Sequence, residues 1–329
     1  MKKILIVAII LLTGLILVWV TRSLTPKESH QITDFTVACR PTTGKIDQKV
    51  FGIGSVGADV EIFNIVQDLG VKWLRLDIPW TDIEPAEGTF KWAGVDLGMR
   101  ELEKRNIGLL AIINHPPDWV WGRDTTLAQN AAKSFGKAIA ARYKGRIKYY
   151  EAFNEPNLPG FGFFREGERV NVKTYVAYLS GLNAGIREAD PAALIVLGGL
   201  SSDENNISRK QFIAELSQNG AGDCFDIFAF HPYGYEDGYL DSLHSELKET
   251  IKSLGLEKPI WFNELGTSDD SKRAEILKGL SNQISNIPGF FWFSVRDLSP
   301  RERYGLVTLD NQKKEPDYSL FKAIVQFVD

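Results

Sequence analysis

Ile147-Lys148-Tyr149-Tyr150-Glu151-Ala152-Phe153-Asn154-Glu155 and Pro259-Ile260-Trp261-Phe262-Asn263-Glu264 are two apolar, aromatic-rich stretches that end in the same Asn-Glu dipeptide. Their length and composition predict buried strands. If both strands belong to one parallel sheet, Glu155 and Glu264 lie at the same carboxyl-terminal edge, where a barrel of such strands forms its active site. Two carboxylates that face each other across a cleft indicate hydrolysis of a glycosidic bond.

Strands and helices alternate through the whole body of the chain. The candidate strands are residues 50–56, 71–78, 107–114, 147–153, 193–198, 225–230, 259–263 and 290–295. The candidate helices, which have a 3.6-residue apolar period, are residues 60–69, 95–105, 127–143, 172–188, 208–219, 240–254, 273–284 and 318–327. This alternation predicts an α/β fold, a single closed (β/α)8 TIM barrel. An open doubly wound sheet is the competing architecture, but no Gly-x-Gly-x-x-Gly turn follows the first strand.

Length and charge indicate the domain division and the class of partner. The chain has 329 residues, of which 44% are hydrophobic and 24% charged, as in ordinary globular proteins. One barrel of about 250 residues plus an N-terminal extension accounts for this length. We assign residues 1–25 to a signal peptide or signal-anchor, residues 26–45 to a linker and residues 46–329 to the barrel. A net charge of -4 argues against nucleic acid as the main partner, and no feature indicates an oligomeric state.

An uncharged apolar stretch, residues 4–20, follows Lys2 and Lys3 and precedes Arg22. Its length is at the lower limit for a membrane-spanning helix, about 17 residues, and slightly long for a cleavable signal. Because no small-x-small cleavage site follows in residues 21–25, an uncleaved transmembrane anchor is favoured over a cleaved signal peptide. In either case the two lysines predict a cytoplasmic N-terminus and an exported body, with the membrane as a partner if the helix is retained.

The chain contains two cysteines, Cys39 and Cys224. In an exported protein they can form a disulfide, which would hold the N-terminal segment beneath the barrel. Two buried free thiols are the equally open alternative, because sequence alone cannot establish that the two residues are close.

The motifs around both glutamates resemble those of a known group of enzymes. Phe153-Asn154-Glu155-Pro156-Asn157 resembles the acid/base motif of the retaining glycoside hydrolases of clan A, and Trp261-Phe262-Asn263-Glu264-Leu265-Gly266 resembles their nucleophile motif. The resemblance extends from about residue 51 to the C-terminus and is nearest to families 39 and 5. It implies a carbohydrate substrate with β-linkages, Glu155 as general acid and base, Glu264 as nucleophile, and Asn154 as a donor to the sugar 2-hydroxyl.

Arg75 lies in the otherwise apolar run of residues 73–80 on the second predicted strand. A guanidinium directed into a barrel requires an anionic partner, because an unpaired buried charge is costly. The resemblance pairs Arg75 with Glu264, which would hold the nucleophile ionised. A purely structural ion pair with Asp77 or another acid is the alternative.

The resemblance also implies supporting residues at three other strand ends. His231 and Tyr233 follow the sixth predicted strand and would line the site, with the Tyr233 hydroxyl near the nucleophile. Trp292 matches the tryptophan that clan members place beneath the sugar at the point of cleavage. Asn114 and His115 follow the third strand, and for them a site role and a structural role are equally open.

Other aromatic residues belong to the loops at the same edge of the predicted barrel. Because aromatic faces stack on sugars, Trp80, Trp119, Trp121 and Tyr235 are candidates for outer subsites. Packing at the barrel rim is an equally good explanation for each. The loop of residues 157–168, which contains Phe161, Phe163 and Phe164, is a candidate wall over the cleft.

Two rival functions remain open from the sequence. A barrel that binds carbohydrate without catalysis would not need two opposed carboxylates. A metal-dependent hydrolase would typically have His-x-His after the first strand, where residues 51–55 offer no ligand, and the chain has only four histidines. We therefore predict a retaining glycosidase that uses neither metal nor cofactor.

Overall fold

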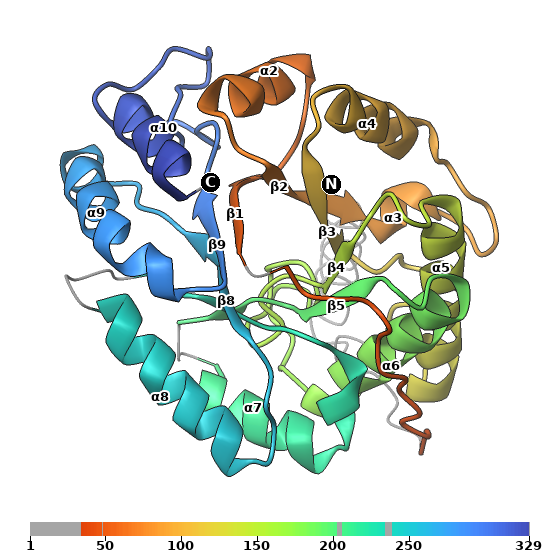
Figure 1. Ribbon diagram of the computed structural model, residues 1–329. Helices are drawn as coiled ribbons and strands as arrows, with labels where there is room; N and C mark the ends of the chain where they lie inside the picture. Colours follow the sequence, from red (N-terminus) through yellow and green to blue (C-terminus); the bar gives the residue numbers. More distant parts are fainter. Residues whose placement is uncertain (1–33, 48, 203–205, 234–238, 329) are drawn as a thin grey trace, which may run out of the picture.

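A curled parallel sheet lies at the centre of the molecule, and a ring of helices surrounds it (Figure 1). The computed structural model describes residues 34–47, 49–202, 206–233 and 239–328. The predicted signal or anchor segment and Tyr235 lie outside these residues. Within the described part of the chain, no helix is both long and apolar enough to cross a membrane.

The sheet contains nine strand segments in the order β5-β4-β3-β2-β1-β9-β8-β7-β6, and all its pairings are parallel. The segments are β1 (Val50–Ser55), β2 (Trp73–Pro79), β3 (Gly108–Asn114), β4 (Tyr149–Ala152), β5 (Leu194–Leu197), β6 (Leu200–Ser201), β7 (Phe228–His231), β8 (Ile260–Leu265) and β9 (Gly289–Phe293). Each of the eight predicted strands has a counterpart, and β6 is an additional two-residue segment that follows the fifth.

The ring closes between β5 and the residues just before β7. The Leu197 N–H donates to the Ile227 carbonyl at 2.9 Å, and the Asp226 N–H donates to the Ile195 carbonyl at 2.7 Å. The break between β5 and β6 falls at Gly198 and Gly199. A Cβ on Gly199 would lie 2.0 Å from His231 Nε2, so only glycine allows that imidazole to occupy its place in the barrel.

The eight predicted helices correspond to α2 and to α4 through α10. Their bounds are α2 (Val60–Leu69), α4 (Ala93–Lys104), α5 (Thr125–Arg142), α6 (Val172–Ala189), α7 (Arg209–Gln218), α8 (Tyr239–Ser253), α9 (Asp270–Gln283) and α10 (Asp317–Val328). Side chains of Asp59, Asp124 and Ser208 accept from backbone N–H groups and fix the starts of α2, α5 and α7. The short segments α3 (Trp80–Ile83), η1 (Ala221–Cys224) and η2 (Ile284–Asn286) were not predicted, because one turn shows no periodicity.

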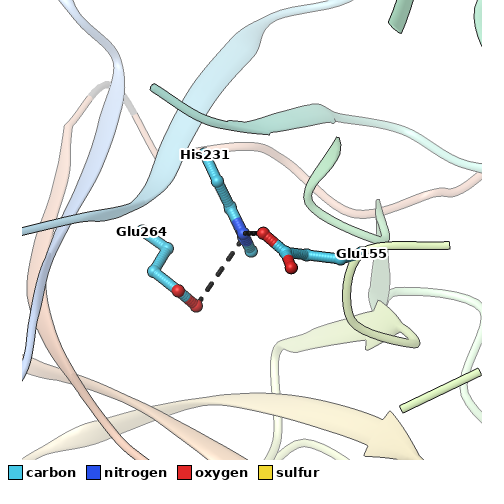
Figure 2. Close-up of side chains that lie close together, drawn as sticks. All are labelled: Glu155, His231 and Glu264. Carbon is cyan, nitrogen blue, oxygen red and sulfur yellow. Dashed lines mark hydrogen bonds and ion pairs between the residues drawn. The ribbon is translucent and has the colours of Figure 1, made fainter. Parts of the chain in front are cut away.

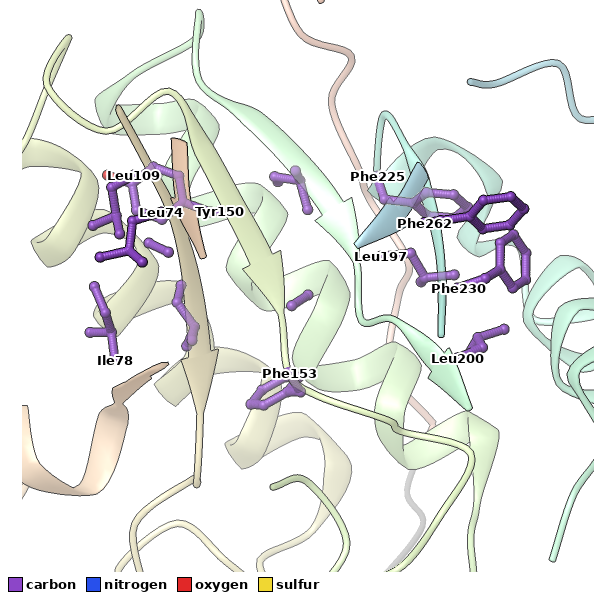
Figure 3. Packing of buried hydrophobic residues seen from close by; sticks show 14 of the residues in the cluster. Leu74, Ile78, Leu109, Tyr150, Phe153, Leu197, Leu200, Phe225, Phe230 and Phe262 are labelled. Atoms are coloured by element: carbon purple, nitrogen blue, oxygen red, sulfur yellow. The ribbon is translucent and has the colours of Figure 1, made fainter. Parts of the chain in front are cut away.

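Apolar side chains form two separate layers on the two faces of the sheet. The larger layer lies between the strands and the helices. Figure 3 shows part of it, including Leu74, Ile78, Leu109, Tyr150, Phe153, Leu197, Leu200, Phe225, Phe230 and Phe262. The smaller layer fills the amino-terminal end of the barrel interior with residues such as Leu110, Tyr149, Trp261 and Phe291. Because successive strand residues face opposite sides, Leu74 points to the helices while Arg75 points into the barrel.

The first described segment, residues 34–45, runs along α6 and packs against the barrel. Cys39 and Cys224 form a disulfide with an S–S distance of 1.96 Å. The Arg40 backbone exchanges two hydrogen bonds with the Asn183 side chain, at 2.8 and 3.2 Å. Since Cys224 ends η1 shortly before β7, this attachment lies toward the amino-terminal end of the strands. From residue 34 onward, the predicted linker is therefore held against the barrel.

Candidate active site

Side chains from four strands meet at the carboxyl-terminal edge of the barrel. Glu155 follows β4, Glu264 is in β8, His231 ends β7 and Arg75 is in β2. Figure 2 shows the His231 imidazole between the two glutamates. The parallel barrel thus brings together residues that are far apart in the sequence, as the two Asn-Glu dipeptides predicted.

His231 connects the two carboxylates. Its Nδ1 lies 2.8 Å from Glu155 Oε1, and its Nε2 lies 3.8 Å from Glu264 Oε2. One carboxylate oxygen of each glutamate and a His231 ring nitrogen all lie within 4.8 Å of one another. Glu155 is 6% exposed and Glu264 9% exposed, whereas His231 is fully buried. The carboxylates therefore retain some contact with solvent, and the histidine supports them from below.

Both oxygens of Glu264 accept short hydrogen bonds. Tyr233 donates its hydroxyl to Oε1 at 2.6 Å, and Arg75 donates from Nη1 to Oε2 at 2.6 Å. Burial alone would raise the pKa of Glu264, but His231, Arg75 and Tyr233 outweigh it and lower the pKa below its ordinary value. Burial and the negative charge of Glu264 raise the pKa of Tyr233 well above its usual range. Glu264 is therefore held as a carboxylate, and Tyr233 remains a hydrogen-bond donor.

Arg75 has a second carboxylate partner, Glu151 of β4, which the sequence pattern does not reveal. Arg75 donates to Glu151 from Nε at 2.8 Å and from Nη2 at 2.9 Å. Glu151 is completely buried, and it also accepts from the Gly199 N–H at 3.1 Å. Its signal in the sequence was a lone acidic residue in a buried aromatic strand, which requires a partner for the same reason that Arg75 does.

The backbone turns sharply where β4 ends. Phe153 has a φ of 66° and Glu155 a φ of 40°, in the left-handed region that non-glycine residues rarely adopt. Such conformations cost about 1–3 kcal/mol each and are typical of functional sites. The turn directs Phe153 into the core and presents Glu155 at the mouth of the barrel.

Asn154 and Asn114 connect this turn to the neighbouring strands. Asn154 Oδ1 accepts from Arg75 Nη2 at 2.7 Å, and Asn154 Nδ2 donates to the Phe161 carbonyl at 3.1 Å. Asn114 accepts from the Asn154 N–H at 3.3 Å and donates to Asp77 at 3.0 Å. His115 is exposed beside them, and its N–H donates to the Gly162 carbonyl at 2.8 Å. The structure therefore brings Asn154, Asn114 and His115 to the same edge as the glutamates.

A family comparison identifies the enzyme group to which this arrangement belongs. Residues 54–297 match the model of Cellulase (glycosyl hydrolase family 5). The chain belongs to this family. The matched region runs from the last residues of β1 to just beyond β9 and includes both glutamates, Arg75, His231 and Tyr233. The predicted resemblance to clan A glycoside hydrolases is confirmed.

Solved structures with the same fold include three named glycoside hydrolases. A family 39 glycoside hydrolase from Bacteroides cellulosilyticus WH2 is 19% identical with a TM-score of 0.68, and the match covers 84% of this chain and 63% of that one. Xylanase 10B from Thermotoga maritima is 17% identical with a TM-score of 0.63, covering 85% and 95%. The exo-β-1,4-mannosidase Op5Man5 from Opitutaceae bacterium strain TAV5 is 15% identical with a TM-score of 0.62, covering 90% and 62%. At these sequence identities the structural similarity shows a shared fold alone.

One residue that was predicted to stack on the sugar, Trp292, does not lie at the active site of this family 5 chain. Trp292 is fully buried and packs against Phe321 of α10, with ring centroids 6.3 Å apart, so its predicted place beneath the sugar is wrong. Residues alternate along β9, and it is Phe293 that faces the barrel mouth. Phe293 is half-buried and contacts Tyr304, which contacts Tyr233, with ring centroids 5.6 and 6.0 Å apart. Phe293 is therefore the aromatic residue of β9 at the site.

The predicted outer subsites are also revised. Trp80 is fully buried against Phe135, and Trp121 is 8% exposed and packs against Phe163. The subsite prediction is wrong for both, because the core covers their rings. Trp119 is half-buried, donates to the Glu84 carbonyl and lines a surface groove along α5, so its role stays a prediction. Phe161 is 52% exposed, and its carbonyl bonds Asn154, which makes it the more accessible aromatic residue near the site.

Glu155, His231 and Glu264 are side-chain types that can also bind metal ions. Here the oxygens of Glu264 are occupied by Tyr233 and Arg75, and His231 Nδ1 is occupied by Glu155. A cation at this place would lie next to the Arg75 guanidinium, whose Nη2 is 3.5 Å from His231 Nε2. With these contacts made and a guanidinium beside them, the donor set is better suited to stabilising the Glu264 carboxylate than to holding a metal.

Proposed function

We propose that this family 5 chain hydrolyses a β-linked poly- or oligosaccharide with retention of configuration. The observation that carries the proposal is the separation of the two carboxylates, whose nearest oxygens lie within 4.8 Å. Retaining glycosidases have carboxyl groups about 5–5.5 Å apart, whereas inverting enzymes need about 6.5–9.5 Å to admit a water molecule. The separation supports a direct attack by one glutamate.

In the first step Glu264 is the nucleophile and Glu155 the acid. The ionised Glu264 attacks the anomeric carbon and forms a glycosyl-enzyme ester, while Glu155 gives its proton to the departing glycosidic oxygen. The lowered pKa of Glu264 supports the first role, because its carboxylate persists at neutral pH. The position of Glu155 supports the other role, because it is 6% exposed at the barrel mouth and one of its oxygens lies within 4.8 Å of a Glu264 oxygen, within reach of the departing glycosidic oxygen.

In the second step the same residues act in reverse. Glu155, now ionised, takes a proton from a water molecule, whose oxygen attacks the anomeric carbon and releases Glu264. Asn154 is positioned for the 2-hydroxyl, because Arg75 fixes its oxygen and leaves a side-chain N–H for the sugar. Phe293 supplies an aromatic face below the sugar.

Hydrolysis of a substrate panel tests this proposal. Solved structures of this fold include enzymes named as xylosidase, glucosidase, xylanase and mannosidase. Aryl β-xylosides, β-glucosides and β-mannosides, together with xylan, glucan and mannan, therefore form the panel. We expect turnover of at least one substrate and its loss in Glu155→Gln and Glu264→Gln. Binding of a sugar without any turnover in the unmutated protein would support a carbohydrate-binding barrel instead.

We also propose that the body acts outside the cytoplasm, either tethered by residues 4–20 or secreted. Support comes from Lys2 and Lys3 before that apolar stretch and from the disulfide between Cys39 and Cys224. Cell fractionation followed by N-terminal sequencing of the mature protein distinguishes the two forms. Recovery of the intact chain with free thiols in the cytoplasm would contradict the proposal.

A further inference from the structure

Arg75 is shared between two carboxylates on different strands. Its Nε and Nη2 atoms face Glu151 of β4, and its Nη1 atom faces Glu264 of β8. The guanidinium is planar, so occupation of one edge by Glu151 fixes the direction in which Nη1 points. Arg75 is 3% exposed and Glu151 is fully buried, which limits screening of this pair by solvent.

Glu151 itself has no route to the substrate. It is covered completely, lies one layer below Glu155, and its Oε1 also accepts from the Gly199 N–H. A buried carboxylate of this kind is usually the partner that compensates a buried cation. Here the cation has a second partner, Glu264, so that one positive charge serves two negative ones.

We propose that Glu151 is a positioning residue that holds one edge of Arg75 and shares its charge, and thereby sets how strongly Arg75 acts on Glu264. This inference rests on the proposed role of Glu264 as nucleophile. Without Glu151, the whole attraction of Arg75 would fall on Glu264. The carboxylate would then be more stable, a weaker nucleophile in the first step and a better leaving group in the second.

Other charged groups act on the same pair and must be held constant in a test. The titratable groups around Arg75, Glu264 and Tyr233 are Asp77, Glu151, Glu155, His231 and Tyr304. Of these, Glu151 has the bidentate contact with Arg75 and no direct contact with Glu264 among the described residues. Changing Glu151 to glutamine keeps the shape and one acceptor but removes the charge.

The experiment is a titration of Glu264 in the unmutated protein and in Glu151→Gln. Carboxyl carbon NMR of glutamate-labelled protein, with Glu264→Gln for assignment, follows the ionisation of Glu264 directly. We expect its titration midpoint, and the acid limb of kcat/KM, to move to lower pH by about one unit in Glu151→Gln. A midpoint and an acid limb that stay in place would overturn the inference, whatever happens to the thermal stability.

Glu84→Gln is the matched control. Glu84 is 2% exposed and accepts from Trp80 Nε1 at 2.7 Å and from the Gly88 N–H at 2.8 Å, so it is also a buried carboxylate with fixed donors. Its neutralisation should change stability but leave the Glu264 midpoint unchanged. If Glu151→Gln does not fold, Glu151→Asp replaces it. The shorter side chain moves the charge away from Arg75 by one methylene, so the Glu264 titration midpoint should fall by a smaller amount. An unchanged Glu264 midpoint in this variant contradicts the inference.

The titration also separates this inference from the proposed function. If the unmutated protein hydrolyses nothing in the substrate panel but the Glu264 midpoint moves in Glu151→Gln, the coupling is present and the assigned catalysis is wrong. If hydrolysis occurs and the midpoint does not move, the catalysis stands and the role of Glu151 is wrong.

Discussion

The barrel interior has two regions that differ in chemistry and in purpose. Toward the amino-terminal end, aromatic rings fill the space, and Tyr149 packs edge-on against Trp73 and Trp261 with ring centroids 5.2 and 4.9 Å apart. Toward the carboxyl-terminal end, the same strands carry charged groups such as Arg75 and Glu151. Burial of apolar surface in the aromatic layer stabilises the fold. The charged groups lose hydration when they are buried, and their contacts with one another offset that cost.

The aromatic region supports the charged region that lies above it in the barrel. The aromatic layer fills the barrel interior below the ionic layer with buried side chains. In such surroundings the charges of Arg75 and His231 act strongly on Glu264, and its pKa is lowered despite its burial. We therefore expect changes in the charged region to alter activity with modest effects on folding, and changes in the aromatic region to do the reverse.

Glu264→Gln should have the largest effect on activity. Loss of the proposed nucleophile is expected to lower kcat by roughly 10⁴-fold or more, because the variant lacks the carboxylate that would form the ester. The unfolding midpoint should change little, since Arg75 keeps Glu151 as its partner. Rates from single-turnover assays and melting curves of the same samples check both parts. If the variant loses its fold together with its activity, the expectation that the charged region affects activity more than folding is wrong.

Glu155→Gln should have the next largest effect, and its size should depend on the leaving group. General acid catalysis contributes about 10²–10⁴-fold, and less where the departing group is already a good one. We expect a large loss on an unactivated disaccharide and a small loss in the first step on a dinitrophenyl glycoside. Comparison of kcat/KM on the two substrates measures this. Equal losses on both would contradict the acid role.

Phe293→Ala compared with Trp292→Phe tests the revised position of the aromatic platform. Loss of the ring at the barrel mouth should lower kcat/KM by up to about tenfold, from stacking worth about 0.5–1.5 kcal/mol. Trp292→Phe changes a ring packed against α10 and should leave kcat/KM within about twofold. The reverse ranking in steady-state assays would restore Trp292 to the site.

Leu110→Ala probes the aromatic region and should have the smallest effect on catalysis. Leu110 is fully buried in the lower layer on β3. Truncation should lower the free energy of unfolding by about 2–5 kcal/mol while kcat per folded molecule stays the same. Chemical denaturation measures the free energy of unfolding, and active-site titration gives the concentration of active enzyme from which kcat per folded molecule is calculated. A matching fall in kcat would show that the two regions are not separable.

Strand and helix positions could be predicted from the sequence because apolar period and length carry that information. The Asn-Glu dipeptides also predicted the edge at which Glu155 and Glu264 meet, since all strands of the sheet run in parallel. The sequence predicts that Arg75 requires an acidic partner, but it does not indicate that Glu151 is one of them. Glu151 stands between two buried residues, and only the register of β4 against β3 and β5 shows that it points inward.

The aromatic predictions failed for a different reason. Phe290, Phe291, Trp292 and Phe293 are consecutive, and a run without polar residues gives no indication of which side chains face the barrel interior. Pairing with β1 fixes the register, with Ile53 opposite Trp292, and an error of one residue exchanges the two faces. Trp80 and Trp121 follow strands in the sequence, but α3 and the packing of α6 carry their rings into the core.

The configuration of the first product tests the central claim most directly. Proton NMR during hydrolysis of a β-linked substrate, recorded before mutarotation, distinguishes the anomers of the newly released reducing end. Two carboxylates within direct reach of one anomeric carbon predict that the β-anomer appears first and the α-anomer grows in slowly. Initial formation of the α-anomer would show a single displacement by water and would contradict the assignment of Glu264 as the nucleophile.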